Sequence, residues 1–182
     1  LSVDTTLANL GELDTSGVDL RVQSSFQTPI GRFSPSVSAT WVDEYSEAVL
    51  PGSPMVDRAG VGNTAGTIPS FKASGTLAWS YKSLAASLTA RYLASYDDVN
   101  GSNVPTGRKV PSKTLYDAQV TFSPASLPGA APAWVKDLKI QAGVINLLDE
   151  GPNFSSLYLF GVDGTQVDPR QRFGYLSLSM TF

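Results

Sequence analysis

Apolar and polar residues alternate along much of the chain. The pattern is clear in the segment GVDLRVQSSF, from Gly17 to Phe26, and in the closing segment FGYLSLSMTF. Successive side chains of a β-strand point to opposite faces of the sheet. Each segment therefore predicts a strand with one apolar and one polar face, and the apolar set of the closing strand ends at Phe182.

The same alternation predicts about seven strands and no helix of note. The strands are expected at residues 17–26, 32–45, 71–81, 85–96, 114–122, 138–148 and 173–182. Pro35 cannot donate to a neighbouring strand, so we expect an irregularity there. Connections near 27–31 and 82–84 are short and the one at 124–137 is of medium length, whereas those at 46–68, 97–111 and 149–171 are long.

The apolar face could pack on a second sheet, as in a β-sandwich, or face lipid, as in a membrane barrel. Aromatic residues gather near the strand ends, as in the two interfacial girdles of a barrel: Phe26, Phe33, Trp79, Tyr81, Phe122 and Phe182 at one end, and Trp41, Tyr92, Tyr96 and Tyr116 at the other. Apolar positions in mid-strand are often Ala or Gly, which fill a sandwich core badly. Short and long connections fall on opposite sides. The pattern favours an antiparallel transmembrane β-barrel segment.

Composition agrees with a barrel and narrows the possible chemistry. Only 16% of the 182 residues are charged, against about 25% in ordinary soluble domains. No apolar run approaches the length of a membrane helix, but a barrel strand needs only about 9–11 residues. The chain has no Cys and no His and a net charge of −3. We therefore predict no enzyme activity, no cofactor, no metal and no nucleic-acid partner.

Two sets of residues are candidates for contact with a ligand. The polar face of the predicted strands should point into a barrel lumen and carries Asp19, Arg21, Lys72, Arg91, Asp117, Gln119, Lys139 and Gln141. The long loops should be extracellular and carry Tyr45, Asn63, Asn100, Asn103, Phe154, Tyr158, Phe160 and Asp163. For both sets we favour the plainer interpretation, which is a solvated or mutually paired wall for the first set and surface loops without a ligand role for the second.

Two loop stretches, DDVNGSN and GVDGTQVD, are rich in oxygen ligands of the kind that Ca²⁺ prefers, but neither has the spacing of an EF-hand. Asn146 and Asp149 are expected to shape the end of a strand and the start of a loop, because Asn and Asp readily bond the backbone two residues further on.

The chain resembles the C-terminal part of TonB-dependent outer-membrane receptors. Their closing region typically reads Gly-x-x-Asn-Leu-Phe-Asp, a loop, Arg, an aromatic pair and a final Phe. The matching residues are Gly143, Asn146, Leu147 and Asp149, with Leu148 in place of Phe, followed by Arg172, Phe173, Tyr175 and Phe182. The segment NLGELDTSGVDL resembles an upstream strand of the family through Asn9, Gly11, Gly17, Val18, Asp19 and Leu20.

The resemblance implies a fold and a function. These receptors are 22-stranded barrels closed by a plug domain, and they import scarce nutrients such as siderophores, cobalamin or oligosaccharides with energy from the TonB complex. Residues 1–182 would supply about the last seven strands in a Gram-negative outer membrane, without the plug or TonB box. The closing strand would be the signal for the barrel-assembly machinery, carried by Tyr175, Leu176, Leu178, Met180 and Phe182.

Two other interpretations stay open. A small self-contained barrel with a structural or adhesive role would need an even number of strands, commonly eight, so a further strand would have to come from residues 1–15. A soluble β-sandwich that binds carbohydrate would cover the apolar face with a second sheet.

In a TonB-dependent receptor, the partners would be lipid, the remainder of the barrel and the plug.

Overall fold

The computed structural model describes residues 11–48, 50–63, 66–124 and 138–180. Nearly all of its regular structure is antiparallel β. The strands are β1 (Glu12–Gln23), β2 (Phe26–Thr28), β3 (Gly31–Ala48), β4 (Val56–Asp57), β5 (Phe71–Tyr81), β6 (Leu84–Leu93), β7 (Tyr96–Val99), β8 (Pro105–Val110), β9 (Lys113–Phe122), β10 (Lys139–Ile145) and β11 (Phe173–Ser179). Within these residues, no helix has the length and apolar content needed to cross a membrane.

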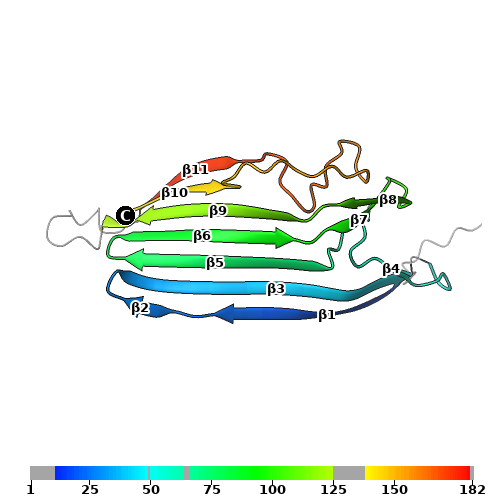
Figure 1. Ribbon diagram of the computed structural model, residues 1–182, viewed down its shortest axis with the longest axis horizontal. Coiled ribbons are helices and arrows are strands. Elements are labelled where there is room, and N and C mark those ends of the chain that lie inside the picture. Colours follow the sequence, from blue (N-terminus) through cyan, green and yellow to red (C-terminus); the bar gives the residue numbers. More distant parts are fainter. Residues whose placement is uncertain (1–10, 49, 64–65, 125–137, 181–182) are drawn as a thin grey trace, which may run out of the picture.

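Seven strands form the main sheet in the order β1-β3-β5-β6-β9-β10-β11 (Figure 1). The small strands β2 and β4 both pair with β3, and β7 pairs with β8 in a separate hairpin. The seven strands correspond one to one to the predicted ones. In the described residues β1 and β11 are the two edges of this sheet and are not paired with each other, so the sheet is an arc and not a closed barrel.

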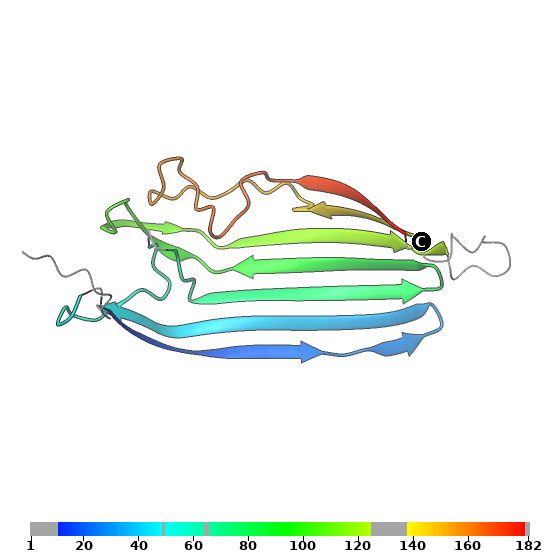
Figure 2. The same ribbon diagram turned by 180° about the vertical axis from the view of Figure 1, so that it is seen from behind.

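Short and long connections lie at opposite ends of the sheet, as predicted. Figures 1 and 2 show the β2–β3 and β5–β6 turns at the end where β11 finishes, and the long connections gathered at the other end. The β2–β3 turn depends on Gly31, whose φ is +125° and where a Cβ would lie 2.5 Å from the Ser80 carbonyl oxygen. The Trp79 indole N–H donates to the Ile30 carbonyl at 2.9 Å and holds this turn against β5.

One face of the sheet is apolar and uncovered. Val18 is 67% exposed and Leu176 is 76% exposed, at opposite edges of the arc, and Val37, Leu77, Leu88 and Val120 between them are also exposed. In the described residues no second sheet packs on this face, so the structure gives no support to a β-sandwich. Residues 1–10, from which a self-contained barrel would need a further strand, lie outside the described residues.

Buried apolar side chains gather at the loop end. They are Ala48, Tyr96, Val99, Val110 and Leu157, each less than 7% exposed. All come from the last residues of β3, the β7–β8 hairpin or the 149–171 connection. In the described residues the compact core is thus formed by the loops, whereas the apolar face of the sheet is left uncovered.

Aromatic pairs mark the two ends of the apolar face. Phe26 and Phe33 stack with ring centroids 5.8 Å apart near the short turns, where Trp79 and Tyr81 also stack. Phe71 and Tyr92 lie 6.0 Å apart toward the loops. The prediction for Tyr96 was wrong: β6 ends at Leu93, and Tyr96 begins β7 and is buried among the loops.

Three further details differ from the predicted strands. β1 begins at Glu12, five residues before Gly17, and an extra residue in β3 opposite Ser16 and Gly17 forms a bulge that shifts the alternation of β3. Gly17 is needed at the bulge, since a Cβ there would lie 2.4 Å from the Trp41 carbonyl oxygen. The third difference is that the predicted loop 97–111 contains most of the β7–β8 hairpin.

The irregularity expected at Pro35 is present. Ser24 donates its backbone N–H to the Pro35 carbonyl at 3.0 Å. Pro35 has no N–H to return the bond, and the ladder with β3 is interrupted between the end of β1 at Gln23 and the start of β2 at Phe26. The other side of Pro35 pairs with Leu77 of β5 without interruption.

Candidate functional site

The three long connections meet around two buried carboxylates, Asp98 and Asp163. Asp98 lies on β7 and Asp163 in the 149–171 connection. Both residues are no more than 2% exposed. Buried carboxylates are costly unless hydrogen-bond donors surround them, so their partners define how the loops are held together.

Asp98 fastens the 149–171 connection to the β7–β8 hairpin. Its carboxylate accepts hydrogen bonds from Arg108 Nη2 at 2.7 Å, from Ser155 Oγ at 3.1 Å and from the Ser156 backbone N–H at 2.9 Å. Burial by itself raises the pKa of Asp98, but the Arg108 guanidinium and the Ser156 and Ser155 donors outweigh it and hold the pKa below its usual value. The Arg108 guanidinium also lies over the Phe154 ring, 4.6 Å from its centroid.

Asp163 fastens the same connection to the loop before β5. Its carboxylate accepts from Thr67 Oγ1 at 2.8 Å, from the Tyr96 hydroxyl at 3.1 Å and from the Thr165 backbone N–H at 3.0 Å. Burial and the neighbouring Asp163 charge raise the pKa of the Tyr96 hydroxyl, which therefore stays protonated and donating. Gln166 adds a second link by donating to the Thr67 carbonyl at 2.9 Å.

The base of the 149–171 connection is held by residues of the closing motif. Asp149 accepts from the Arg172 guanidinium at 2.9 Å and from its backbone N–H at 3.1 Å. Asn146 is buried and exchanges two hydrogen bonds with the Glu150 backbone at 2.9 and 3.0 Å. Asn146 and Asp149 have positive φ values of 56° and 61°, so the prediction that they shape the strand end and loop start is confirmed.

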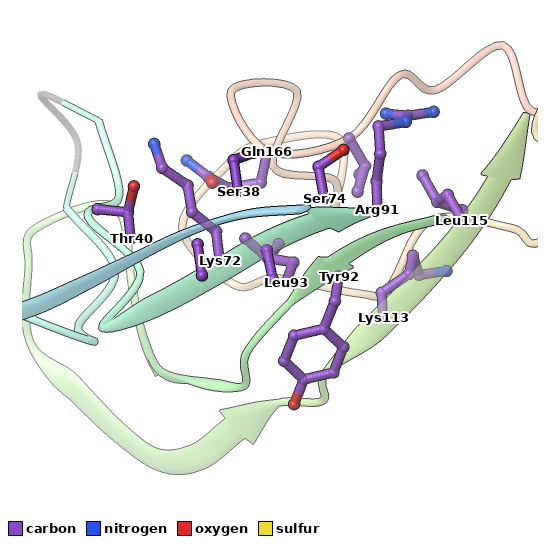
Figure 3. A pocket seen from close by; sticks show the side chains of 13 residues that line it. Ser38, Thr40, Lys72, Ser74, Arg91, Tyr92, Leu93, Lys113, Leu115 and Gln166 are labelled. Carbon is purple, nitrogen blue, oxygen red and sulfur yellow. The ribbon is translucent and has the colours of Figure 1, made fainter. Parts of the chain in front are cut away.

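Beneath this connection lies a cavity of about 310 Å³ against the polar face of the sheet. Figure 3 shows Thr40, Lys72, Ser74 and Arg91 projecting toward the side on which Gln166 lies, while the Tyr92 ring projects the other way. The lining comes from β3, β5, β6 and β9 below and from residues 166–167 above. The connection thus forms a roof over the loop end of the polar face.

The strand registers place all eight predicted polar-face residues on one face. One row pairs Asp19 with Thr40 and Lys72, and the next row pairs Arg21 with Ser38, Ser74 and Arg91. Gln119, Gln141, Lys139 and Asp117 fall on the same side through their pairing with β6, β10 and β11.

Four of these residues are paired with one another or with the closing strand. Arg91 donates two hydrogen bonds to Asp117, at 2.7 and 2.9 Å. The Tyr175 hydroxyl donates to Gln119 at 2.8 Å and accepts from Gln141 at 3.3 Å. Asp19 accepts a bond from Thr40 at 2.6 Å. The structure thus joins much of this wall into cross-strand pairs.

The predicted loop residues separate into inner and outer groups. Asp163 is central to the buried cluster, and Asn63 is buried and donates to Glu47 at 3.2 Å. Asn100 shapes the β7–β8 turn by accepting from the Ser102 and Val104 backbone N–H groups, and Asn103 also lies in this turn. Tyr45 is on β3, with its N–H bonded to Asp57.

The outer group carries apolar side chains. Phe160 is 90% exposed and Phe154 is also exposed, so both are presented to the outside of the 149–171 connection. Tyr158 lies between them in sequence, and its hydroxyl is buried without a hydrogen-bond partner among the described residues.

The functional residues that the sequence analysis did not identify are mainly those that surround the two carboxylates. Tyr96, Arg108, Ser155 and Thr67 come from three separate segments of the chain. The Asp/Asn-rich stretches did mark Asp98 and Asp163, but as possible Ca²⁺ ligands, whereas the structure surrounds both with protein donors. Among the described residues no group of three or more acidic side chains is placed to hold a metal ion.

The predicted assembly segment forms the edge strand β11. Leu176 and Leu178 lie exposed on the apolar face, whereas Tyr175 lies on the polar face over Gly143. Met180 follows the strand, and Phe182 lies outside the described residues.

Comparison with known proteins identifies the family. Residues 1–147 match the family described as TonB dependent receptor-like, beta-barrel. No curated protein and no solved structure matches the chain. The family match covers most of the 182 residues, so the chain belongs to the TonB-dependent receptor-like β-barrel family.

Proposed function

We infer from membership of this family that the chain is the C-terminal arc of an outer-membrane receptor barrel that takes up a scarce nutrient. The family is one of receptors with a transport role, not of enzymes, and its members interact with TonB and carry a plug. The observation that carries the proposal is the apolar face, uncovered from Val18 at one edge to Leu176 at the other. Such a face is stable when it meets lipid.

The arc then has a definite orientation in a Gram-negative outer membrane. The polar face lines the lumen, the roof of residues 149–171 lies on the extracellular side, and the short turns lie in the periplasm. Strands β1 and β11 pair with the remainder of a barrel of about 22 strands, because unpaired strand edges are not tolerated in lipid.

The partners and the cargo follow from the family and from this orientation. The lumen wall faces the plug, through which the TonB complex acts, and the closing strand engages the barrel-assembly machinery. The imported nutrient is a siderophore, cobalamin or an oligosaccharide, which the loops cover from outside and the polar wall meets during passage.

Cysteine labelling tests the orientation cleanly, because the chain has no Cys of its own. Leu159→Cys places a thiol at a position that is 95% exposed in the 149–171 connection, and Ile30→Cys places one at a position that is 66% exposed in the β2–β3 turn. Intact cells that express the receptor are treated with a membrane-impermeant maleimide, and the parent protein gives the background.

We expect Leu159→Cys to react in intact cells and Ile30→Cys to react only after the outer membrane is permeabilised. Reaction of Ile30→Cys alone in intact cells would invert the orientation. Equal reaction of both variants in intact cells, or recovery of the receptor in the soluble fraction, would refute the membrane proposal.

A further inference from the structure

The cavity under residues 166–167 is lined by cations. Lys72, Arg91 and Lys113 contribute to its walls, and no carboxylate does so among the described residues that line it. This sign is unusual for a chain with 16 acidic and 13 basic residues. The volume of about 310 Å³ is at the lower end of the range for small-molecule sites, about 300–1,000 Å³.

The registers bring the three cations close together. Leu93 pairs with Lys72 on one side and with Lys113 on the other, so two strand spacings of about 4.8 Å separate the two lysine rows. Arg91 is two residues along β6 from Leu93 and lies on the same face. Side chains of one sign that line a cleft give it a common electrostatic field, which here is positive.

Lys72 has no hydrogen-bond or ion-pair partner among the described residues. Its neighbours differ: Arg91 is bonded to Asp117 at 2.7 Å, and Lys113 donates to the Gly151 carbonyl. Figure 3 shows the Lys72 side chain reaching up into the space beside Gln166. An ammonium group with three donors is therefore presented to the cavity.

The nearby acids are already engaged. Asp19 accepts from Thr40 at 2.6 Å, and Asp117 holds Arg91 and the Asn146 backbone N–H. Asp168 lies close enough to Arg91 for that charge to contribute to its lowered pKa, but its carboxylate is bonded to Arg170 at 2.6 Å. Among the described residues none of the three forms an ion pair with Lys72.

We propose that this cavity binds an anionic group, a carboxylate or a phosphate, of the solute that the receptor imports. Lys72 supplies the free charge, Arg91 and Lys113 add to the field, and the Ser38 and Ser74 hydroxyls on the cavity wall supply neutral donors. The inference rests on the proposed function, because it is the lumen of an uptake barrel that exposes this wall to a solute.

Chemical protection of the lysines tests this inference in the intact receptor, purified in detergent with its plug. A small acetylating reagent modifies exposed amines, and mass spectrometry reports the rate at each lysine. Citrate and inorganic phosphate are the probes, sucrose is the uncharged control, and sodium chloride keeps the ionic strength constant. Lys82, in the β5–β6 turn at the opposite end of the sheet, is the internal reference.

We expect citrate or phosphate to slow acetylation of Lys72 at least fivefold relative to Lys82, with no effect of sucrose. Arg91→Gln should reduce this protection, whereas Arg32→Gln, at the short-turn end of β3, should leave it unchanged. The anion that protects more strongly distinguishes a carboxylate from a phosphate.

Two results would overturn the inference. If Lys72 is acetylated as fast in citrate and in phosphate as in sodium chloride, the cavity does not bind anions. If Lys72 is acetylated only after the plug is removed, its partner is a carboxylate of the plug and not a solute. Both results are compatible with correct labelling of Leu159→Cys and Ile30→Cys, so they would leave the proposed function standing.

Discussion

In the sheet, side chains touch mainly their neighbours on adjacent strands, whereas at the loop end side chains from three distant segments surround two buried carboxylates. The sheet leaves Leu88 and Leu176 exposed on its apolar face, which lipid would cover in the proposed barrel. The loop end buries Tyr96, Val99 and Leu157 by itself. The stability of the sheet thus depends on the medium that covers its apolar face, whereas the stability of the loop end depends on contacts among the loops.

The largest expected effect comes from placing a charge on the apolar face. Leu88→Arg puts a guanidinium at mid-strand on β6, where a lipid-facing Arg costs about 2–4 kcal/mol. Ser87→Arg, one residue away on the polar face, is the matched control. We expect Leu88→Arg to reduce the amount of folded receptor in outer membranes, measured by heat-modifiable mobility in gel electrophoresis, and Ser87→Arg to leave it near normal. Equal losses would refute the assignment of the faces.

A smaller effect is expected at the loop end, from Asp98→Ala. Removing this carboxylate leaves Ser155 and the Ser156 N–H without their acceptor, which costs about 1–3 kcal/mol of local stability. Hydrogen exchange of residues 150–170 should quicken while exchange in β5 and β6 stays slow.

Asp97→Ala is the control for this substitution. Asp97 pairs with Lys109 at 2.7 Å, but both side chains are more than half exposed, and such surface pairs contribute little. Faster exchange in β5 and β6 as well would show that the loops and the sheet unfold as one unit.

The smallest effect is expected from pH, and it should appear only at the loop end. The pKa of Asp98 is lowered in the folded state, so its contribution to stability is present above the unfolded value near 4 and is lost as the pH falls through the folded value. The pKa of Tyr96 is raised, so its contribution is present below about 10 and is lost at higher pH.

Spin labels can measure the pH range over which Asp98 and Tyr96 keep the loop end packed. Labels at Lys109→Cys and Leu159→Cys should give a narrow distance distribution between about pH 5 and 9 that broadens beyond both limits. Labels at Ile30→Cys and Ser83→Cys, at the turn end, should not change. Broadening at both ends of the sheet would show that the carboxylates are not its cause.

The sheet was predictable because its signal is local. Alternation of apolar and polar residues within about ten residues identified the strands, and the alternation of short and long connections identified the two ends of the sheet. The same signal failed where alternation runs past a strand end: Tyr92, Ala94 and Tyr96 follow in step, but β6 stops at Leu93. The Ala94 N–H donates to the Phe71 carbonyl, and Tyr96 then turns into the loop core.

The buried cluster could not be predicted, because its bonds join residues far apart in the chain. Asp98 and Ser155 are 57 residues apart, and Thr67 and Asp163 are 96 apart. A composition rich in Asp and Asn indicates polar loops but not which donor each carboxylate meets. The bulge opposite Gly17 was not predicted for a related reason, since it is a property of the β1–β3 pair and not of either strand.

The contact between Tyr175 and Gly143 has a consequence for assembly. The ring occupies the place where a Cβ on Gly143 would be, 2.4 Å from its outer carbon, and its hydroxyl reaches Gln119 two strands away. If β11 slipped by two residues along β10, the ring would meet Gln141 or Ile145 instead. Either side chain would displace the ring, so Gly143 favours the observed register of β11 over a slip by two residues in either direction. The absence of a side chain at Gly143 thus helps to select the register in which β11 pairs with β10 during assembly.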